Sequence, residues 1–139
     1  MYVEYSGTAY GDVLKHEPIS DIKKVYETAK KEYKEKYNID VLTQFSFNNT
    51  YAIGVRADTA ETYKLKTISD LQKVSGDLVL SATLEFLNRE DDLLGLEKLY
   101  NLKFKKTLGV DGGPRYIALM NNESDAVDVF TTDGLIKKV

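Results

Sequence analysis

The stretch LVLSA at residues 78–82, apolar except at Ser81, predicts a buried strand over residues 78–81. Before it, residues 67–70 have the pattern of a capping box that begins a helix, and after it a turn or short helix is expected at residues 84–88. The same alternation continues on both sides, with strands predicted at 51–56, 104–107 and 126–130 and helices at 58–63, 93–100 and 114–120. This order is typical of an α/β fold with a mostly parallel central sheet flanked by helices.

The N-terminal third of the chain contains the clearest helix of the sequence, at residues 21–37. Its apolar side chains recur every three or four residues, and the opposite face is rich in lysine, so that face is expected to be solvated. Ser20 is the predicted N-cap and Asn38 the predicted end of this helix. Strands are expected at residues 2–5 and 40–47, and a short helix at residues 9–15.

The amino-acid composition is typical of a soluble, globular protein. The 139 residues are 42% hydrophobic and 29% charged, which predicts one soluble, globular structural unit. The net charge is −3 and acids alternate with bases, so a nucleic-acid surface is not expected. Cysteine is absent, which excludes disulfides and thiolate chemistry. No apolar run approaches the roughly 20 residues that a bilayer-spanning helix needs.

Catalytic groups are scarce. The single histidine, His16, lies between two charged residues close to a proline and is expected in a surface loop. No Ser-His-Asp or Cys-His set can be assembled around it. The acidic run at residues 90–92 is expected to be a solvated turn rather than a metal site, because a divalent cation needs convergent oxygen ligands. We therefore predict a binding function without catalytic residues, metal or cofactor.

Ligands of α/β proteins bind at strand ends, and four such segments combine aromatic, hydroxyl or arginine side chains: residues 5–8, 49–51, 85–89 and 130–134. Aromatic faces attract a quaternary ammonium group through cation–π contacts, and arginine pairs with a carboxylate. A zwitterionic betaine carries both groups. Taken singly, each segment is equally compatible with an ordinary strand end.

The same segments carry a family resemblance. EYSGT at residues 4–8 resembles an EYTGT motif, and FNNTYA at 47–52 resembles an NTYA segment. LKTISDL at 65–71, FLNRED at 86–91 and TDG at 132–134 continue the series in order along the whole chain. This ordered set is similar to the substrate-binding proteins of glycine betaine/choline/carnitine ABC importers.

The resemblance implies a type II periplasmic-binding-protein fold, in which two lobes close on a ligand. Residues 1–139 would form the single inserted second lobe, with hinge strands at about 1–6 and 129–135, and the first lobe would be missing. The implied ligand-binding residues are Tyr5, Thr8, Tyr51, Arg89, Phe130 and Thr132. Tyr5 and Tyr51 would be cage aromatics, and Arg89 would pair with a ligand carboxylate. Phe130 stands where the family often has another cage tyrosine, so it keeps the π face and loses the hydroxyl.

The function implied by the resemblance is ligand capture for an osmoprotectant importer. The ligand would be a trimethylammonium compound: glycine betaine, carnitine, choline or a larger betaine such as ergothioneine. Choline has no carboxylate and would leave Arg89 unpaired, at a cost in affinity. The partners would be the missing lobe and an ABC permease, in an extracytoplasmic location reached through a lipid anchor or a permease fusion. The alternatives are a ligand-sensing regulatory domain on the same fold and, with the least support, an enzyme.

Overall fold

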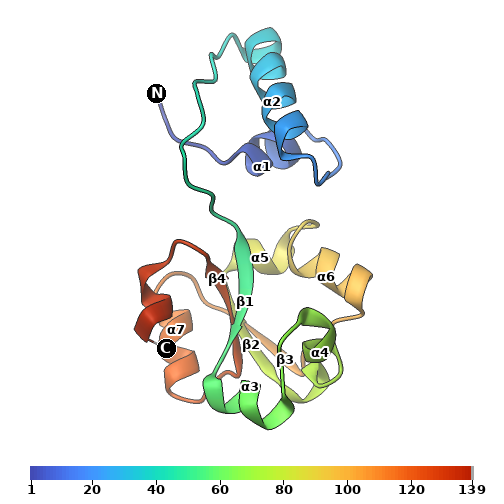
Figure 1. The fold of residues 1–139 in the computed structure, drawn as a ribbon, viewed down its shortest axis with the longest axis vertical. Helices are drawn as coiled ribbons and strands as arrows, with labels where there is room; N and C mark the ends of the chain where they lie inside the picture. Colours follow the sequence, from blue (N-terminus) through green and yellow to red (C-terminus); the bar gives the residue numbers. More distant parts are fainter. Residues whose placement is uncertain (139) are drawn as a thin grey trace. The chain divides into compact units, whose positions relative to one another are not determined.

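The computed structural model describes residues 1–138, so Val139, the last residue of the predicted lobe, lies outside the described residues. The sequence predicted one structural unit, whereas the chain divides into two compact units (Figure 1), unit 1 at Met1–Phe47 and unit 2 at Asn48–Val139. Each unit has its own buried core.

Unit 1 is helical and comprises α1 (Ser6–Thr8), η1 (Ala9–Val13, a π-helix) and α2 (Ile22–Tyr37). The N-cap of α2 is Asp21 rather than the predicted Ser20, because the Asp21 carboxylate accepts a hydrogen bond from the backbone N–H of Lys24 at 3.0 Å. The helix ends at Asn38 as predicted, where the backbone is left-handed with φ of 53°.

The core of unit 1 is small and consists of Ala9, Leu14, Ala29 and Tyr33, with Val41 packed against it. The strands predicted at residues 2–5 and 40–47 are wrong, since no described residue pairs with either segment in a sheet. The role of residues 1–6 as a hinge stays a prediction. An alternating pattern gives a strand only when a neighbouring strand takes up its backbone hydrogen bonds.

Unit 2 is built on a four-stranded sheet of strand order β1-β4-β2-β3. Its strands are β1 (Tyr51–Val55), β2 (Val79–Ala82), β3 (Lys106–Gly109) and β4 (Ala126–Phe130). β2 is parallel to both β3 and β4, while β1 is antiparallel to β4. The sheet is therefore mostly parallel, as predicted. β3 begins two residues later than expected, because Phe104 packs beside the core instead.

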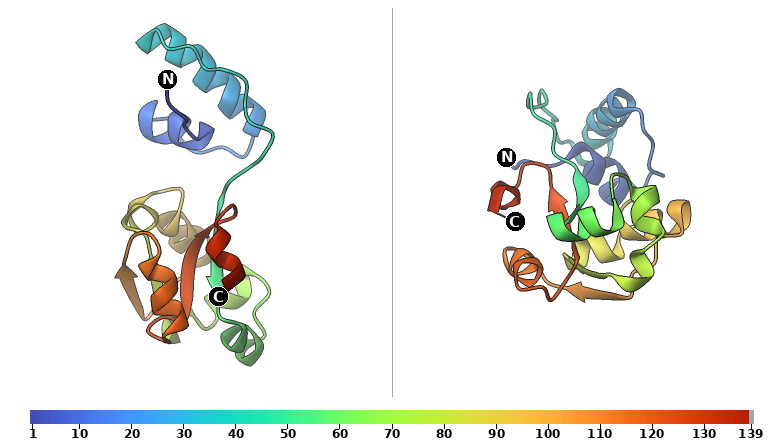
Figure 2. Two further views of the ribbon diagram at one scale, coloured as in Figure 1. Left: turned by 90° about the vertical axis from the view of Figure 1, so that its left-hand side faces the viewer. Right: turned by 60° about the horizontal axis from the view of Figure 1, so that its bottom comes forward.

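Helices cover both faces of the sheet (Figure 2). On one face α4 (Ile68–Gln72), α5 (Leu84–Asn88) and α6 (Leu93–Tyr100) contribute Leu71, Phe86 and Leu93 to the main core around Leu80. On the other face α7 (Pro114–Met120) and η3 (Gly134–Lys138) pack against β4. The short elements α3 (Ala57–Tyr63) and η2 (Ser75–Asp77) follow β1 and precede β2. No helix within residues 1–138 is long and apolar enough to cross a membrane.

Two helix starts in unit 2 form as the sequence predicted. The capping box forms: the Thr67 hydroxyl accepts from the N–H of Asp70, and the Asp70 carboxylate accepts from the N–H of Thr67. Pro114 opens α7, where a missing N–H costs nothing. These caps set where the helices begin, and so which residues remain at the ends of the strands.

Candidate functional site

Two aromatic rings meet where β1 begins and β4 ends. Tyr51 lies directly opposite Phe130 in the antiparallel register, and their ring centroids are 4.8 Å apart with planes tilted by 38°. The Tyr51 ring also packs 5.2 Å from the ring of Phe86, a core residue. This edge carries the carboxyl ends of the parallel strands β2 and β4, which is where α/β sheets bind ligands.

Tyr51 is a neutral phenol in this environment. Burial raises the pKa of its hydroxyl, and the carboxylates of Glu85 and Asp92 raise it further. A neutral phenol keeps its O–H as a hydrogen-bond donor while the ring offers a π face. Tyr51 can therefore contact a cation by its ring and an acceptor by its hydroxyl.

Arg89 is paired within its own chain. Its Nε and Nη2 donate to the two carboxylate oxygens of Asp91 at 2.8 and 2.7 Å, and its Nη1 donates to Glu85 at 2.8 Å. Asp92 lies 3.3 Å from Nε. The side chain of Arg89 is only 13% exposed. The hydrogen bonds from Arg89 lower the pKa of the Asp91 carboxyl. The contact of Arg89 with a ligand carboxylate stays a prediction.

The acidic run at residues 90–92 was expected to be a solvated turn, and this is wrong for Asp92, which is buried against Arg89. The largely buried guanidinium of Arg89 attracts both carboxylates, so Asp92 has a charge partner in its buried position while Asp91 stays partly exposed. Among the described residues, no cluster of three or more histidine, cysteine, aspartate or glutamate side chains could hold a metal ion.

Thr132 belongs to a set of contacts that joins the start of unit 2 to the segment after β4. Its hydroxyl donates to the side-chain oxygen of Asn49 at 2.9 Å. The N–H of Thr131 donates to the carbonyl of Thr50 at 3.0 Å, and the N–H of Thr50 donates to the Thr131 hydroxyl at 3.1 Å. The two segments are thus held side by side at the aromatic edge of the sheet.

The other two predicted site residues lie in unit 1. Tyr5 is the residue before α1 and is 54% exposed, and Thr8 is the last residue of α1. The structure brings Tyr51 and Phe130 together, with Thr132 two residues beyond Phe130 and Arg89 close enough to Tyr51 to act on its pKa. The roles of Tyr5 and Thr8 stay predictions.

A buried charged cluster behind Phe130 was missed by the sequence reasoning. Asp128 is fully buried inside β4, and Arg115, at 3% exposure, lies with its Nε 3.0 Å from the Asp128 carboxylate. Asp128 also accepts from the N–H of Thr83 at 3.2 Å and from its hydroxyl at 3.0 Å. The available signal was an aspartate in the middle of the apolar strand AVDVF, because a buried carboxylate requires a partner.

The cluster continues into the turn after β4. Asp133 accepts from the Tyr116 hydroxyl at 2.9 Å and lies 3.4 Å from Nη2 of Arg115. The pKa of the Asp133 carboxyl is lowered, first by the N–H of Leu135 and then by Tyr116 and Arg115. Burial raises the pKa of Tyr116 to about 12 and raises the pKa of Asp128. Asp133 is therefore an ionised partner for Arg115 at neutral pH.

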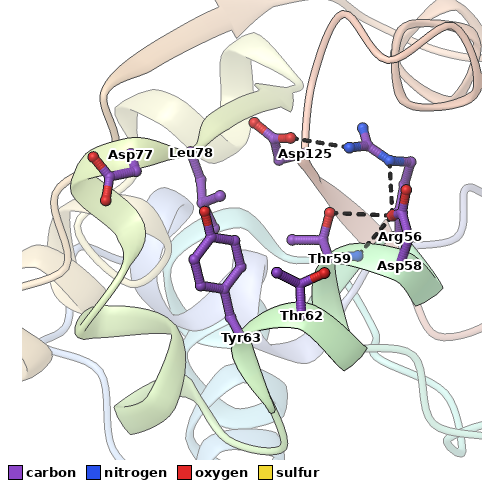
Figure 3. Close-up of a pocket in the computed structure, with 8 residues that line it drawn as sticks. All are labelled: Arg56, Asp58, Thr59, Thr62, Tyr63, Asp77, Leu78 and Asp125. Atoms are coloured by element: carbon purple, nitrogen blue, oxygen red, sulfur yellow. Dashed lines mark hydrogen bonds and ion pairs between the residues drawn. The ribbon is translucent and has the colours of Figure 1, made fainter.

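A cleft of about 270 Å³ lies at the opposite ends of the strands, beyond the end of β1 (Figure 3). Arg56 pairs there with Asp58 and Asp125, each at 3.1 Å, and its guanidinium also donates to the carbonyl of Ser124. The remaining lining residues are Thr59, Thr62, Tyr63, Asp77 and Leu78. This cleft contains none of the predicted ligand-binding residues.

Comparison with known proteins identifies the family. The model of the substrate binding domain of ABC-type glycine betaine transport systems, OpuAC, matches residues 1–139. The chain belongs to this family. OpuAC domains bind substrates for transport and are not a class of enzymes, and the resemblance read from the motifs is confirmed.

Curated relatives of this OpuAC chain are longer proteins. The chain is 36% identical over its full length to the ergothioneine transport permease/ergothioneine binding protein EgtU of Helicobacter pylori (strain G27), and covers 25% of that protein. It is 35% identical over 133 residues to the carnitine transport binding protein OpuCC of Listeria monocytogenes, 43% of which it covers. The chain thus spans less than half the length of these relatives.

Solved structures confirm the fold class. The crystal structure of a glycine betaine/carnitine/choline ABC transporter matches with a TM-score of 0.73 at 35% identity, over 96% of this OpuAC chain and 49% of the other. Apo YehZ from Escherichia coli matches with a TM-score of 0.60 at 30% identity, over 52% of its own chain. The chain therefore has the α/β fold of the periplasmic-binding-protein class, with a mixed sheet flanked by helices.

Proposed function

We propose that the protein containing this chain captures a trimethylammonium compound for an ABC importer. The observation that carries the proposal is the Tyr51–Phe130 ring pair at the ligand edge of the sheet in a member of the OpuAC family. A quaternary ammonium group carries no hydrogen-bond donor, so aromatic faces are the groups suited to hold it. The relatives are named for ergothioneine, carnitine and glycine betaine, which are all betaines.

The ligand is proposed to bind between two lobes, one of which is unit 2. The sequence placed the first hinge at residues 1–6, within a single lobe of residues 1–139. The hydrogen bonds between residues 49–50 and 131–132 instead support crossing points at these two segments, because a chain that enters and leaves a lobe at adjacent places can turn about them as a hinge. Tyr5 and Thr8 are kept as proposed ligand contacts on the strength of the family resemblance alone.

Binding measurements have to decide among the ligands, because the contacts of Arg89 do not disfavour choline. Its guanidinium is balanced by Glu85, Asp91 and Asp92 without any ligand, so a ligand lacking a carboxylate would not leave it unpaired. A ligand carboxylate would have to share Arg89 with these acids. Glycine betaine, carnitine, choline and ergothioneine all remain candidates on this basis.

The proposed partners follow from the importer role. They are the remainder of the same protein, an ABC permease and a small-molecule ligand, in an extracytoplasmic location reached through a lipid anchor or a permease fusion. We propose no catalytic residue and no cofactor. The named relatives are transport and binding proteins, and no observation favours a ligand-sensing regulator instead.

Calorimetric titration of the intact protein with glycine betaine, carnitine, choline and ergothioneine tests the proposal. We expect at least one of the four to bind, and Tyr51→Ala to weaken that binding by roughly 3- to 30-fold, the usual size of one cation–π contact. Tyr63→Ala is the matched control, since Tyr63 lines the cleft at the opposite edge. The proposal is refuted if none of the four ligands binds, or if both tyrosine variants bind as tightly as the wild type.

A further inference from the structure

We infer that Arg115 is a positioning residue for ligand binding: its buried guanidinium holds the Phe130 ring and the turn at residues 131–133 in one arrangement and thereby sets the affinity of the site. The inference rests on the proposed function. It concerns a residue that belongs to none of the motifs that carry the family resemblance.

All three guanidinium nitrogens of Arg115 meet oxygen atoms from different parts of the fold. Nε donates at 3.0 Å to the backbone carbonyl of Asp128 and lies at the same distance from its carboxylate. Nη1 donates to the carbonyl of Gly112 at 2.6 Å, and Nη2 lies 3.4 Å from the carboxylate of Asp133. One planar group therefore joins the loop before α7, strand β4 and the turn that follows it.

The same group lies against the aromatic edge. The central carbon of the guanidinium is 5.4 Å from the centroid of the Phe130 ring and 4.6 Å from that of Tyr116. Phe130 in turn packs against Tyr51 on β1. A shift of the guanidinium would therefore be passed to both rings that are proposed to contact the ligand, because close-packed side chains move together.

The turn is fixed through Asp133. Its Oδ2 accepts from the Tyr116 hydroxyl at 2.9 Å, and its Oδ1 accepts from the N–H of Leu135 at 3.1 Å. The neighbouring Thr132 is held on its other side by Asn49. Arg115 thus supports the segment at residues 131–133, whose Thr132 binds Asn49. Loss of the Arg115 guanidinium would loosen this proposed crossing point as well as the Phe130 ring.

The charge balance suits a cationic ligand. Arg115 lies between two carboxylates, those of Asp128 and Asp133, so its positive charge is compensated and does not repel a cation at the Phe130 ring. Lysine in its place would keep the charge but could not reach three acceptors from one plane. Arg115→Lys therefore alters the positioning of Phe130 and the turn without changing the net charge.

The test compares two arginines of unit 2 in the intact protein. Arg56 is also largely buried, pairs with Asp58 and Asp125 and lies at the opposite edge of the sheet. We expect Arg115→Lys and Arg56→Lys both to lower the melting temperature, but only Arg115→Lys to weaken ligand binding, by about tenfold in calorimetry. A purely structural role would move the melting temperature alone.

Asp133→Asn is the second variant, for the case in which Arg115→Lys does not fold. It removes one of the two charge partners of Arg115 while keeping an oxygen for Tyr116, and Asp125→Asn is its control beside Arg56. We expect Asp133→Asn alone to weaken binding, by about threefold. A wild type that binds none of the four ligands refutes the proposed function and this inference with it. The inference alone is refuted if the wild type binds a ligand and either variant, Arg115→Lys or Asp133→Asn, binds it within twofold of the wild type. It is likewise refuted if either variant binds no more weakly than its own control.

Discussion

Replacement of Asp128 by alanine should destabilise unit 2 by about 3–5 kcal/mol, the usual cost of breaking a fully buried ion pair by removing one partner. The magnitude follows from burial: the side chain of Asp128 is 0% exposed and that of Arg115 is 3% exposed, so neither charge can turn to water. The substitution also removes the acceptor for the hydroxyl of Thr83, which caps α5. At this size the melting temperature should fall by about 10–20 °C.

Urea unfolding followed by circular dichroism measures the effect, with Asp58→Ala as the matched control. Asp58 also pairs with an arginine of unit 2, at 3.1 Å from Arg56, but its side chain is 71% exposed. Solvent screens such a pair, so its removal should change stability far less. The reasoning would be refuted if the two alanine variants lost stability equally, since the pairs differ chiefly in burial.

Two further predictions concern the ends of helices. Asn38→Ala should destabilise the chain by about 1 kcal/mol while Asn38→Gly should not, because alanine disfavours the left-handed backbone with φ of 53° at this position. Thermal melts of the two variants test this, and equal losses of stability would contradict it. Hydrogen bonds from Lys73 and Thr67 lower the pKa of the Asp70 carboxyl to about 2 from 3.8, so its charge stabilises the folded state above about pH 4 and this contribution is lost as the pH falls towards 2. The difference in melting temperature between wild type and Asp70→Asn should therefore shrink between pH 4 and pH 2, and a constant difference would show that the carboxylate charge is not the cause.

Much of unit 2 was predictable because its signals are local. The capping box at Thr67 and the proline at the start of α7 each act within one helical turn, and both elements begin where the sequence indicated. β4 has the predicted bounds because a short apolar run between turns leaves little choice. The prediction for β3 was two residues early, because Phe104 could serve the core equally well from outside the strand.

The partners of the charged residues were less predictable. Arg89 was expected to pair with a ligand carboxylate, yet it already binds Glu85 and Asp91, which lie four and two residues away in the sequence. Arg115 is separated from Asp128 by 13 residues and from Asp133 by 18, so nothing in the local pattern connects them. They meet only because α7 packs against β4.

The sequence by itself determined the family, the α/β class and the helices and strands of unit 2, because motifs, caps and periodicity depend on neighbours along the chain. Only the tertiary structure decided that residues 2–5 and 40–47 are not strands, that the chain forms two units and that a buried guanidinium lies behind Phe130. Strand pairing and charge burial depend on which distant segments pack together, and that is a property of the folded chain.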